Sequence, residues 1–214
     1  MRYKQFIVST LCLGAFAVCT VFWGESSVRG QNTSPLDTAP GATSSAPGTA
    51  APAPTGNLIP NGDFALATQD PAWPDGWSKP KGPGTTWESD GGVHFLRLVA
   101  QEPGKMLMLY REVGTPAGVK NLQVTFKYRT SGIVAGAQNW MNARAMFHFL
   151  DANRKTVAPD PHVLVFSGPP VTWAEATETC AVPAGATTLV LMPSLFKVQA
   201  GTLDLAEIKV VPAP

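Results

Sequence analysis

A two-residue alternation of apolar and polar side chains is the feature that most limits how this chain can fold. Residues 122–129 read Leu-Gln-Val-Thr-Phe-Lys-Tyr-Arg, and a similar pattern runs from Val93 to Leu98. Successive side chains of a strand point to opposite faces, so each of these segments buries one face and exposes the other to water. The pattern is typical of an antiparallel sheet with one solvated face.

Further segments carry a strand signal, and turn residues separate nearly all of them. These segments are 105–113, 141–151, 162–166, 172–180, 187–191 and 203–211. Asp90-Gly91-Gly92 and Pro183-Ala184-Gly185 are examples of the intervening turns. Their spacing suits about eight to ten strands. The sequence therefore predicts an all-β fold, an antiparallel β-sandwich of the jelly-roll type.

The first 30 residues read as an export signal or an N-terminal anchor. Arg2 and Lys4 precede an uncharged, mostly apolar run from Phe6 to Trp23. Ala15-Phe16-Ala17 offers a small-x-small cleavage site, whereas the run of about 18 residues is also at the lower limit for spanning a bilayer. We expect a secreted or cell-envelope protein that touches a membrane only through this segment, if it is not cleaved.

Residues 31–56 have the composition of a disordered linker. Prolines are scattered among Ala, Thr, Ser and Gly, with one charge and no aromatic residue. Such a segment cannot bury enough apolar surface to form a core. The linker leads to one expected domain, residues 57–214.

The composition of residues 57–214 excludes some functions. Thirteen Lys and Arg residues balance 13 Asp and Glu residues, so the domain lacks the basic field that nucleic acid binding requires. We expect a monomer.

Cys12 and Cys19 lie in the export segment, which leaves Cys180 without a partner for a disulfide within the domain. Cys180 is expected to be a small buried residue and not a nucleophile.

Five motifs follow one another in an order that resembles a known family. They are Asn57-Leu58-Ile59-Pro60-Asn61-Gly62-Asp63-Phe64, Gly76-Trp77, Phe126-Lys127-Tyr128-Arg129-Thr130, Phe149-Leu150-Asp151-Ala152-Asn153, and the stretch from Trp173 through Pro183-Ala184-Gly185-Ala186 to Gly201-Thr202-Leu203. This order resembles the secreted carbohydrate-binding modules that share the galactose-binding-like jelly roll. The resemblance implies a glycan partner. It also implies that 57–64 is the opening strand and that Trp77 closes one end of the sandwich.

Two positions depart from that family's pattern. Its members often hold a structural calcium through an acidic residue after the opening Phe and another in the last strand, where this chain has Ala65 and Ala206. Calcium takes about six to eight oxygen ligands, so the loss of two carboxylates counts against the site. We expect no metal and no cofactor.

The strand expected around 140–149 carries the leading candidate site. Alternation places Ala143, Ala145, Phe147 and Phe149 on the apolar face, and Trp140, Asn142, Arg144, Met146 and His148 on the other. An aromatic ring beside amide and guanidinium donors suits a sugar ring and its hydroxyls. The alternatives are a rim role for Trp140, an ion pair for Arg144 and an edge hydrogen bond for His148.

Other residues extend the candidate site. Lys127 and Arg129 would lengthen the polar row on a neighbouring strand, and Trp73 and Trp87 lie in or next to loops where a rim platform could form. Trp173 is expected in the core.

Catalysis is not expected, because the chain lacks the usual constellations. Glu175 and Glu178 are three residues apart on a presumed strand and so face opposite sides. Two hypotheses remain: a non-catalytic carbohydrate-binding module, or a structural or adhesive cell-envelope protein whose jelly roll contacts other proteins.

Overall fold

Ten strands build the part of the chain that the computed structural model describes, residues 56–167 and 171–214. They are β1 (Thr85–Asp90), β2 (Val93–Val99), β3 (Leu107–Met108), β4 (Arg111–Gly114), β5 (Asn121–Val134), β6 (Ala143–Leu150), β7 (Thr156–Val165), β8 (Ala174–Ala181), β9 (Thr188–Leu195) and β10 (Ala200–Ala213). Within these residues no helix has the length and apolar character to cross a membrane. The export segment, residues 1–30, and nearly all of the 31–56 linker lie outside the described residues.

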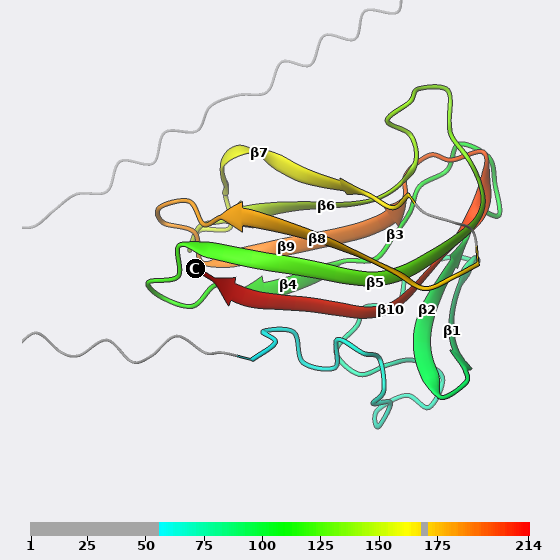
Figure 1. Ribbon diagram of the computed structural model, residues 1–214, viewed down its shortest axis with the longest axis horizontal. Helices are drawn as coiled ribbons and strands as arrows, with labels where there is room; N and C mark the ends of the chain where they lie inside the picture. Colours follow the sequence, from blue (N-terminus) through cyan, green and yellow to red (C-terminus); the bar gives the residue numbers. More distant parts are fainter. Residues whose placement is uncertain (1–55, 168–170) are drawn as a thin grey trace, which may run out of the picture. The chain divides into compact units, whose positions relative to one another are not determined.

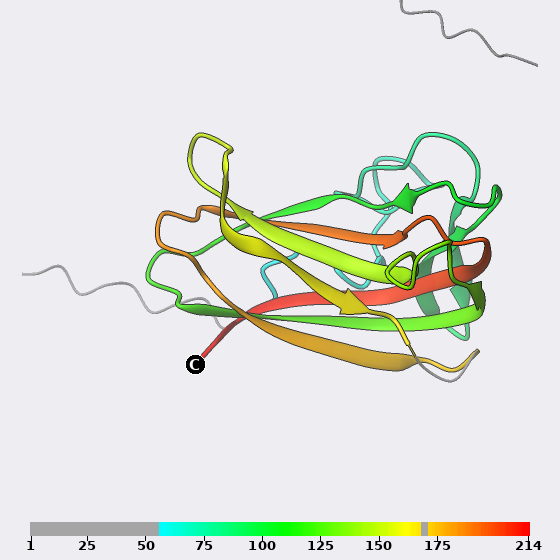
Figure 2. The same cartoon turned by 90° about the horizontal axis from the view of Figure 1, so that it is seen from above.

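The strands form two antiparallel sheets that pack face to face (Figures 1 and 2). The first has the order β1-β2-β10-β5-β8, and the second has the order β3-β9-β6-β7, with β4 also paired to β9. The sequence prediction of an all-β antiparallel sandwich is confirmed. Each sheet has an inner face, turned toward the other sheet, and an outer face, turned away from it.

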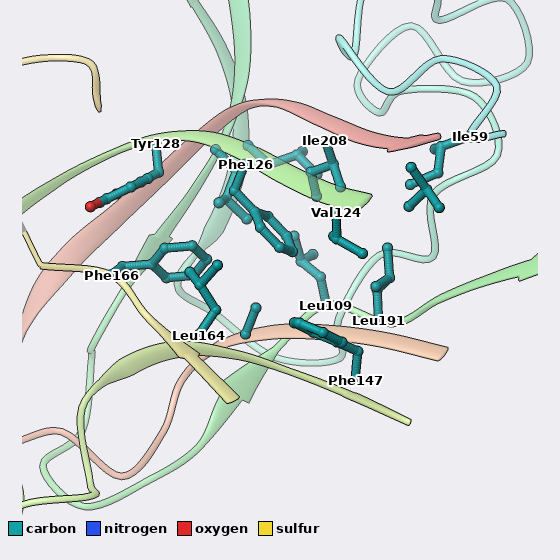
Figure 3. Packing of buried hydrophobic residues seen from close by; sticks show 14 of the residues in the cluster. Ile59, Leu109, Val124, Phe126, Tyr128, Phe147, Leu164, Phe166, Leu191 and Ile208 are labelled. Atoms are coloured by element: carbon teal, nitrogen blue, oxygen red, sulfur yellow. The ribbon is translucent and has the colours of Figure 1, made fainter. Parts of the chain in front are cut away.

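The core lies between the sheets and follows the alternation read from the sequence. Along β5, Leu122, Val124, Phe126 and Tyr128 are buried, while the residues between them are partly exposed. Figure 3 shows Phe126 and Val124 pointing toward Phe147, Leu191 and Leu109 of the opposite layer. Cys180 is buried with this cluster, and burial raises the pKa of its thiol to about 11. The structural role expected for Cys180 fits this position.

The opening segment 57–64 is not a strand, which corrects the prediction. Pro60 has no N–H to donate, and Asn61 and Phe64 have positive φ angles of 53° and 58°, so no regular ladder forms. The segment instead lies along β10, where Leu58 N donates to Val210 O at 2.8 Å and Ile208 N donates to Gly62 O at 2.8 Å. A Cβ at Gly62 would lie 2.3 Å from Ile208 O, so only glycine fits there.

Other differences concern single elements. β1 was not predicted, and the segment expected at 105–113 is divided into β3 and β4. Trp77 is buried against Phe64, with ring centroids 4.9 Å apart, as expected for a residue that closes one end of the sandwich. Trp173 is only half-buried and lies outside the core cluster, which corrects the expectation of a core position.

Candidate functional site

Strand β6 presents its side chains as the sequence predicted. Its inward residues are buried, namely Ala143, Ala145, Phe147 and Phe149. The outward residues Arg144, Met146 and His148 face away from the core, and Asn142 lies just before the strand. The candidate row therefore lies on one outer face, that of the β3-β9-β6-β7 sheet.

Neighbouring strands make this outer face broadly apolar. Strand register sets Met146 opposite Met192 of β9 and Val163 of β7, and sets Arg144 opposite Ser194 and Val165. Met108 of β3 is also opposite Ser194. We call this surface the apolar platform; its residues are Met108, Tyr110, Trp140, Met146, Val163, Val165, Met192 and Phe196.

Several platform side chains are well exposed to solvent. Trp140 is 47% exposed and Tyr110 is 40% exposed, and Val163 and Val165 are each 44% exposed. The outer face of an antiparallel sheet is ordinarily polar. An exposed apolar surface of this kind is a candidate for binding a ligand or a partner.

One corner of the platform combines aromatic rings with polar donors. The ring centroids of Trp140 and Phe196 are 5.7 Å apart, and the Arg144 guanidinium lies 5.4 Å above the Phe196 ring. Arg144 Nε donates to Asn142 Oδ1 at 2.8 Å. Arg144 is only 7% exposed, and this burial lowers its pKa below the ordinary value. In the described parts of the chain Arg144 makes no ion pair, so the alternative of a carboxylate partner on a neighbouring strand is not what the structure shows.

The opposite corner is held by an ion pair. Tyr110 donates its hydroxyl to Glu112 Oε1 at 2.8 Å, and the guanidinium of Arg154 binds both oxygens of the same carboxylate. The bonds from Arg154 and then Tyr110 lower the pKa of Glu112 to about 2. His148 is half-buried on this side, opposite Val190. The two corners thus place polar groups at both ends of an apolar strip.

Lys127 and Arg129 do not extend this row, which corrects the prediction. Both lie on β5, which belongs to the β1-β2-β10-β5-β8 sheet, whereas Arg144 lies on β6 of the other sheet and Trp140 lies in the turn before β6. The chain passes from one sheet to the other between β5 and β6. Consecutive strands are therefore not neighbours here, and the two groups of side chains lie on opposite outer faces.

Trp73 and Trp87 do not form a rim platform either. Trp73 is 5% exposed, and its Nε1 donates to Trp77 O at 2.7 Å. Trp87 is half-buried on β1, donates its Nε1 to Phe64 O at 3.1 Å and stacks on His94. Both rings are used in packing because their indole N–H groups find carbonyl partners inside the fold.

The outer face of the β1-β2-β10-β5-β8 sheet has a charged cluster of its own. Asp204, buried on β10, accepts hydrogen bonds from Arg97 Nε and Nη2 at 2.8 and 2.9 Å, and from Arg129 Nε at 2.6 Å. Arg97 also donates to Glu88, and Arg129 to Asp90. Chiefly because of the Asp204 bond, the pKa of Arg97 lies above its ordinary value.

This cluster borders a depression of about 430 Å³, which we call the arginine depression. Its lining consists of Arg97, Val99, Arg129, Thr130, Ser131, Val171, Thr202 and Asp204. The Phe95 side chain is 1% exposed and lies beneath the Arg97 and Arg129 guanidinium groups, which are both within 5.2 Å of its ring centroid. Trp173 packs edge-on against Phe95 and stacks under Arg129 at 4.5 Å.

Ala65 and Ala206 lie together, although they are far apart in the sequence. Both line one shallow depression of about 200 Å³ with Asp63, Lys127 and Glu207. No group of three or more His, Cys, Asp or Glu residues that could hold a metal ion occurs within residues 56–167 and 171–214. The absence of a metal stays a prediction.

Glu175 and Glu178 lie on opposite faces of β8, as the sequence predicted. Glu175 lies opposite Lys127 on the outer face, whereas Glu178 points to the other side and lies 3.8 Å from His162. The two carboxylates cannot act together on one bond, since they lie on opposite faces of β8.

The sequence reasoning missed Tyr110, Met192 and Phe196 on the platform, and Arg97 and Asp204 on the other face. Tyr110 lies in the gap between β3 and β4, where no alternation is visible. Asp204 stands between Leu203 and Leu205 in a predicted strand, and a lone carboxylate there was a signal that a cation lies across it.

Comparison with known proteins places the fold. No profile of a known protein family matches the chain, and no curated protein matches its sequence. Among solved structures, the enzymatically active domain of tailspike protein 4 of bacteriophage CBA120 is similar, with a TM-score of 0.55 and 14% identity. The match covers 73% of this chain and 21% of that chain, so this chain corresponds to a small part of the tailspike.

Carbohydrate-binding modules are also among the similar structures. A family 16 module matches with a TM-score of 0.44 and 17% identity, over 72% of this chain and 99% of the module. The CBM22-1 xylan-binding domain of Xyn10C from Paenibacillus barcinonensis matches with a TM-score of 0.44 and 15% identity, over 77% of this chain and all of that domain. At 14% identity, the likeness to the tailspike domain concerns the fold alone.

Proposed function

We propose that the protein is a non-catalytic carbohydrate-binding module that binds a poly- or oligosaccharide on the apolar platform. The observation that carries the proposal is the exposed ring of Trp140 beside Arg144 and Asn142 on a sheet face. Sugar rings present an apolar face of C–H groups and a rim of hydroxyls. An exposed indole suits the first, and the Asn142 amide, which the nearly buried Arg144 holds through its Nε–H, suits the second.

The platform suits an extended ligand more than a small one. Trp140 and Phe196 lie at one end, Met108 lies opposite Ser194 further along, and Tyr110 lies at the level of Met192 and Met146 near the other end. Tyr110 is held in place by Glu112, which reduces the entropy lost when a sugar stacks on its ring. A chain of several sugar units could thus contact both aromatic ends at once.

The test is a glycan array on the full-length protein, followed by affinity electrophoresis in gels that contain the polysaccharides bound on the array. We expect binding by the wild type and at least about a tenfold loss in Trp140→Ala, in line with the contribution of one stacked aromatic ring. Leu66→Ala, at an exposed apolar position in the segment that bonds to Asn61 and Asp75, serves as the control and should bind as the wild type does. Equal binding by wild type and Trp140→Ala would remove the platform from the proposal.

A protein-binding role is the second candidate, and a specific observation favours it. Between the two aromatic ends the platform is aliphatic, with Met108, Met146, Met192, Val163 and Val165. Methionine-rich surfaces adapt well to protein partners. In this alternative the protein is a structural or adhesive component of the cell envelope, and the array shows no glycan that depends on Trp140.

The proposed location and assembly state rest on the sequence. We infer export through residues 1–30 and a monomeric domain at the end of the 31–56 linker. Cell fractionation of the expressed full-length chain tests the location, and sedimentation equilibrium tests the assembly state. A stable dimer that Trp140→Ala dissociates would identify the platform as a self-association surface instead of a sugar site.

A further inference from the structure

We propose that the arginine depression is a second ligand site, on the face opposite the platform, and that it binds a sugar residue bearing a carboxylate. The depression and the platform share no residue, so this second site does not depend on sugar binding at the first. It rests on the geometry of Arg97, Arg129 and Asp204 and on the hydroxyl groups beside them.

Asp204 fixes the orientation of two guanidinium groups. It is 2% exposed and binds Arg97 through two parallel hydrogen bonds and Arg129 through one. Rotation of either guanidinium would break these bonds, so the remaining N–H groups point in set directions. Arg129 Nη2 makes no hydrogen bond to any residue that the structure describes, and it is the donor available to a ligand. Preorganised, planar donors of this kind match a carboxylate.

Arg129 already binds one exposed carboxylate, that of Asp90, which lies beside the depression and outside its lining. Asp90 Oδ2 lies 3.2 Å from Arg129 Nη1, while the Asp90 side chain is 64% exposed. A long bond to an exposed side chain is weak and readily exchanged. A ligand carboxylate in the depression can therefore compete with Asp90 for the terminal nitrogens of Arg129.

The rest of the lining favours a sugar over an acidic peptide. Ser131 and Thr202 lie opposite each other on β5 and β10, and both residues line the depression. Val99 and Val171 supply an apolar boundary. Hydroxyl groups beside apolar carbon suit a ring that carries several hydroxyls. The volume of about 430 Å³ is in the range of small-ligand sites.

Carboxylates near the depression repel a negatively charged ligand and so weaken its binding. Glu88 binds Arg97 and Asp90 binds Arg129, so with Asp204 the three carboxylates exceed the two guanidinium groups by one. Removing Asp90 should for that reason strengthen binding, which makes Asp90→Asn a gain-of-binding test. The exposed position of Asp90 makes the variant compatible with folding.

The experiment measures binding of a galacturonate trimer and of its methyl ester to the full-length protein by calorimetry. We expect the acid to bind at least about tenfold more tightly than the ester, because the ester keeps the ring but loses the charge that Arg129 recognises. Asp90→Asn should tighten binding of the acid by about threefold or more, and Thr202→Val should weaken it. Glu175→Gln removes the same charge from the same sheet at a distance and should change little, which controls for net charge.

The proposal is overturned by equal binding of acid and ester, by no gain in Asp90→Asn, by a gain in Glu175→Gln as large as in Asp90→Asn, or by tighter binding of a poly-glutamate peptide than of the sugar acid. Trp140→Ala separates this site from the platform. It should leave binding of the galacturonate trimer unchanged even where it abolishes binding on the platform, and loss of both would place the acid on the platform.

Discussion

Replacement of Asp204 by Asn should destabilise the domain more than any other single change of charge. Asp204 is nearly inaccessible and accepts three hydrogen bonds from Arg97 and Arg129. Removing one partner of a buried ion pair costs about 3–5 kcal/mol. The Arg97 and Arg129 side chains are 31% and 17% exposed and keep Glu88 and Asp90 as partners, so we expect a smaller loss, about 2–3 kcal/mol.

Urea unfolding followed by tryptophan fluorescence measures this loss. The midpoint should fall with the slope unchanged, because the variant alters stability and not the surface exposed on unfolding. In thermal scans the loss corresponds to about 5–10 °C in Tm for a domain of this size. The matched control is Glu207→Gln on the same strand. Among the described residues Glu207 forms an ion pair only with Lys209, and it is partly exposed, so its loss should cost about 0.5 kcal/mol or less.

Equal losses in the two variants would refute the reasoning. Such a result would mean that water screens the Asp204 cluster as it screens an ordinary surface ion pair, and the orientation of the two guanidinium groups could no longer be attributed to Asp204.

Three further predictions concern other parts of the domain. The pKa of Glu112 is lowered to about 2, so its ionised form stabilises the fold fully above the ordinary carboxyl pKa of 4.5. This contribution should be lost as the pH falls from 4.5 toward 2. In Arg154→Gln, NMR titration should show the pKa of Glu112 returning toward 4.5. Cys180 should resist thiol reagents at pH 8 until urea unfolds the domain, because burial raises its pKa to about 11; rapid labelling of the native protein would contradict this. EDTA should leave the Tm unchanged, since Ala65 and Ala206 offer no carboxylates; a fall in Tm that calcium reverses would show a metal site.

Local patterns predicted the faces of single strands well. The alternation along β5 and β6 placed Phe126, Phe147 and Arg144 on their correct sides, because a strand has only two sides and the core must take the apolar one. β1 escaped prediction since Trp87 is its single large apolar residue. Its position comes from pairing with β2 and from the Trp87 ring that reaches the core, and neither is visible within six residues.

The sequence did not predict which strands belong to the same sheet. Arg129 and Trp140 are close in the chain, yet they lie on opposite faces of the sandwich because the chain changes sheets between them. Single-strand alternation says which residues share a side but not which strands share a sheet. The same limit hid the arginine depression, whose parts come from strands that begin as far apart as Val93 and Ala200.

Trp73 shows that the exposure of a loop residue is also hard to predict from its sequence neighbours. Its neighbours Ala72 and Pro74 suggested an exposed loop, but the loop folds so that the indole N–H meets Trp77 O inside the fold. A tryptophan in a loop carries enough apolar surface to bring the loop down onto the core.

The contact between the opening segment and β10 has a consequence for self-association. β2 pairs with β10 only over Thr202–Leu205, and beyond that point residues 57–64 occupy the same edge through Leu58 N, Gly62 O and the Asn57 side chain. An uncovered edge with free N–H and C=O groups is a template on which a second chain can add a strand. A fragment that begins after Phe64 would expose that edge. Residues 57–64 therefore prevent the β10 edge of one folded copy from pairing with a strand of another copy.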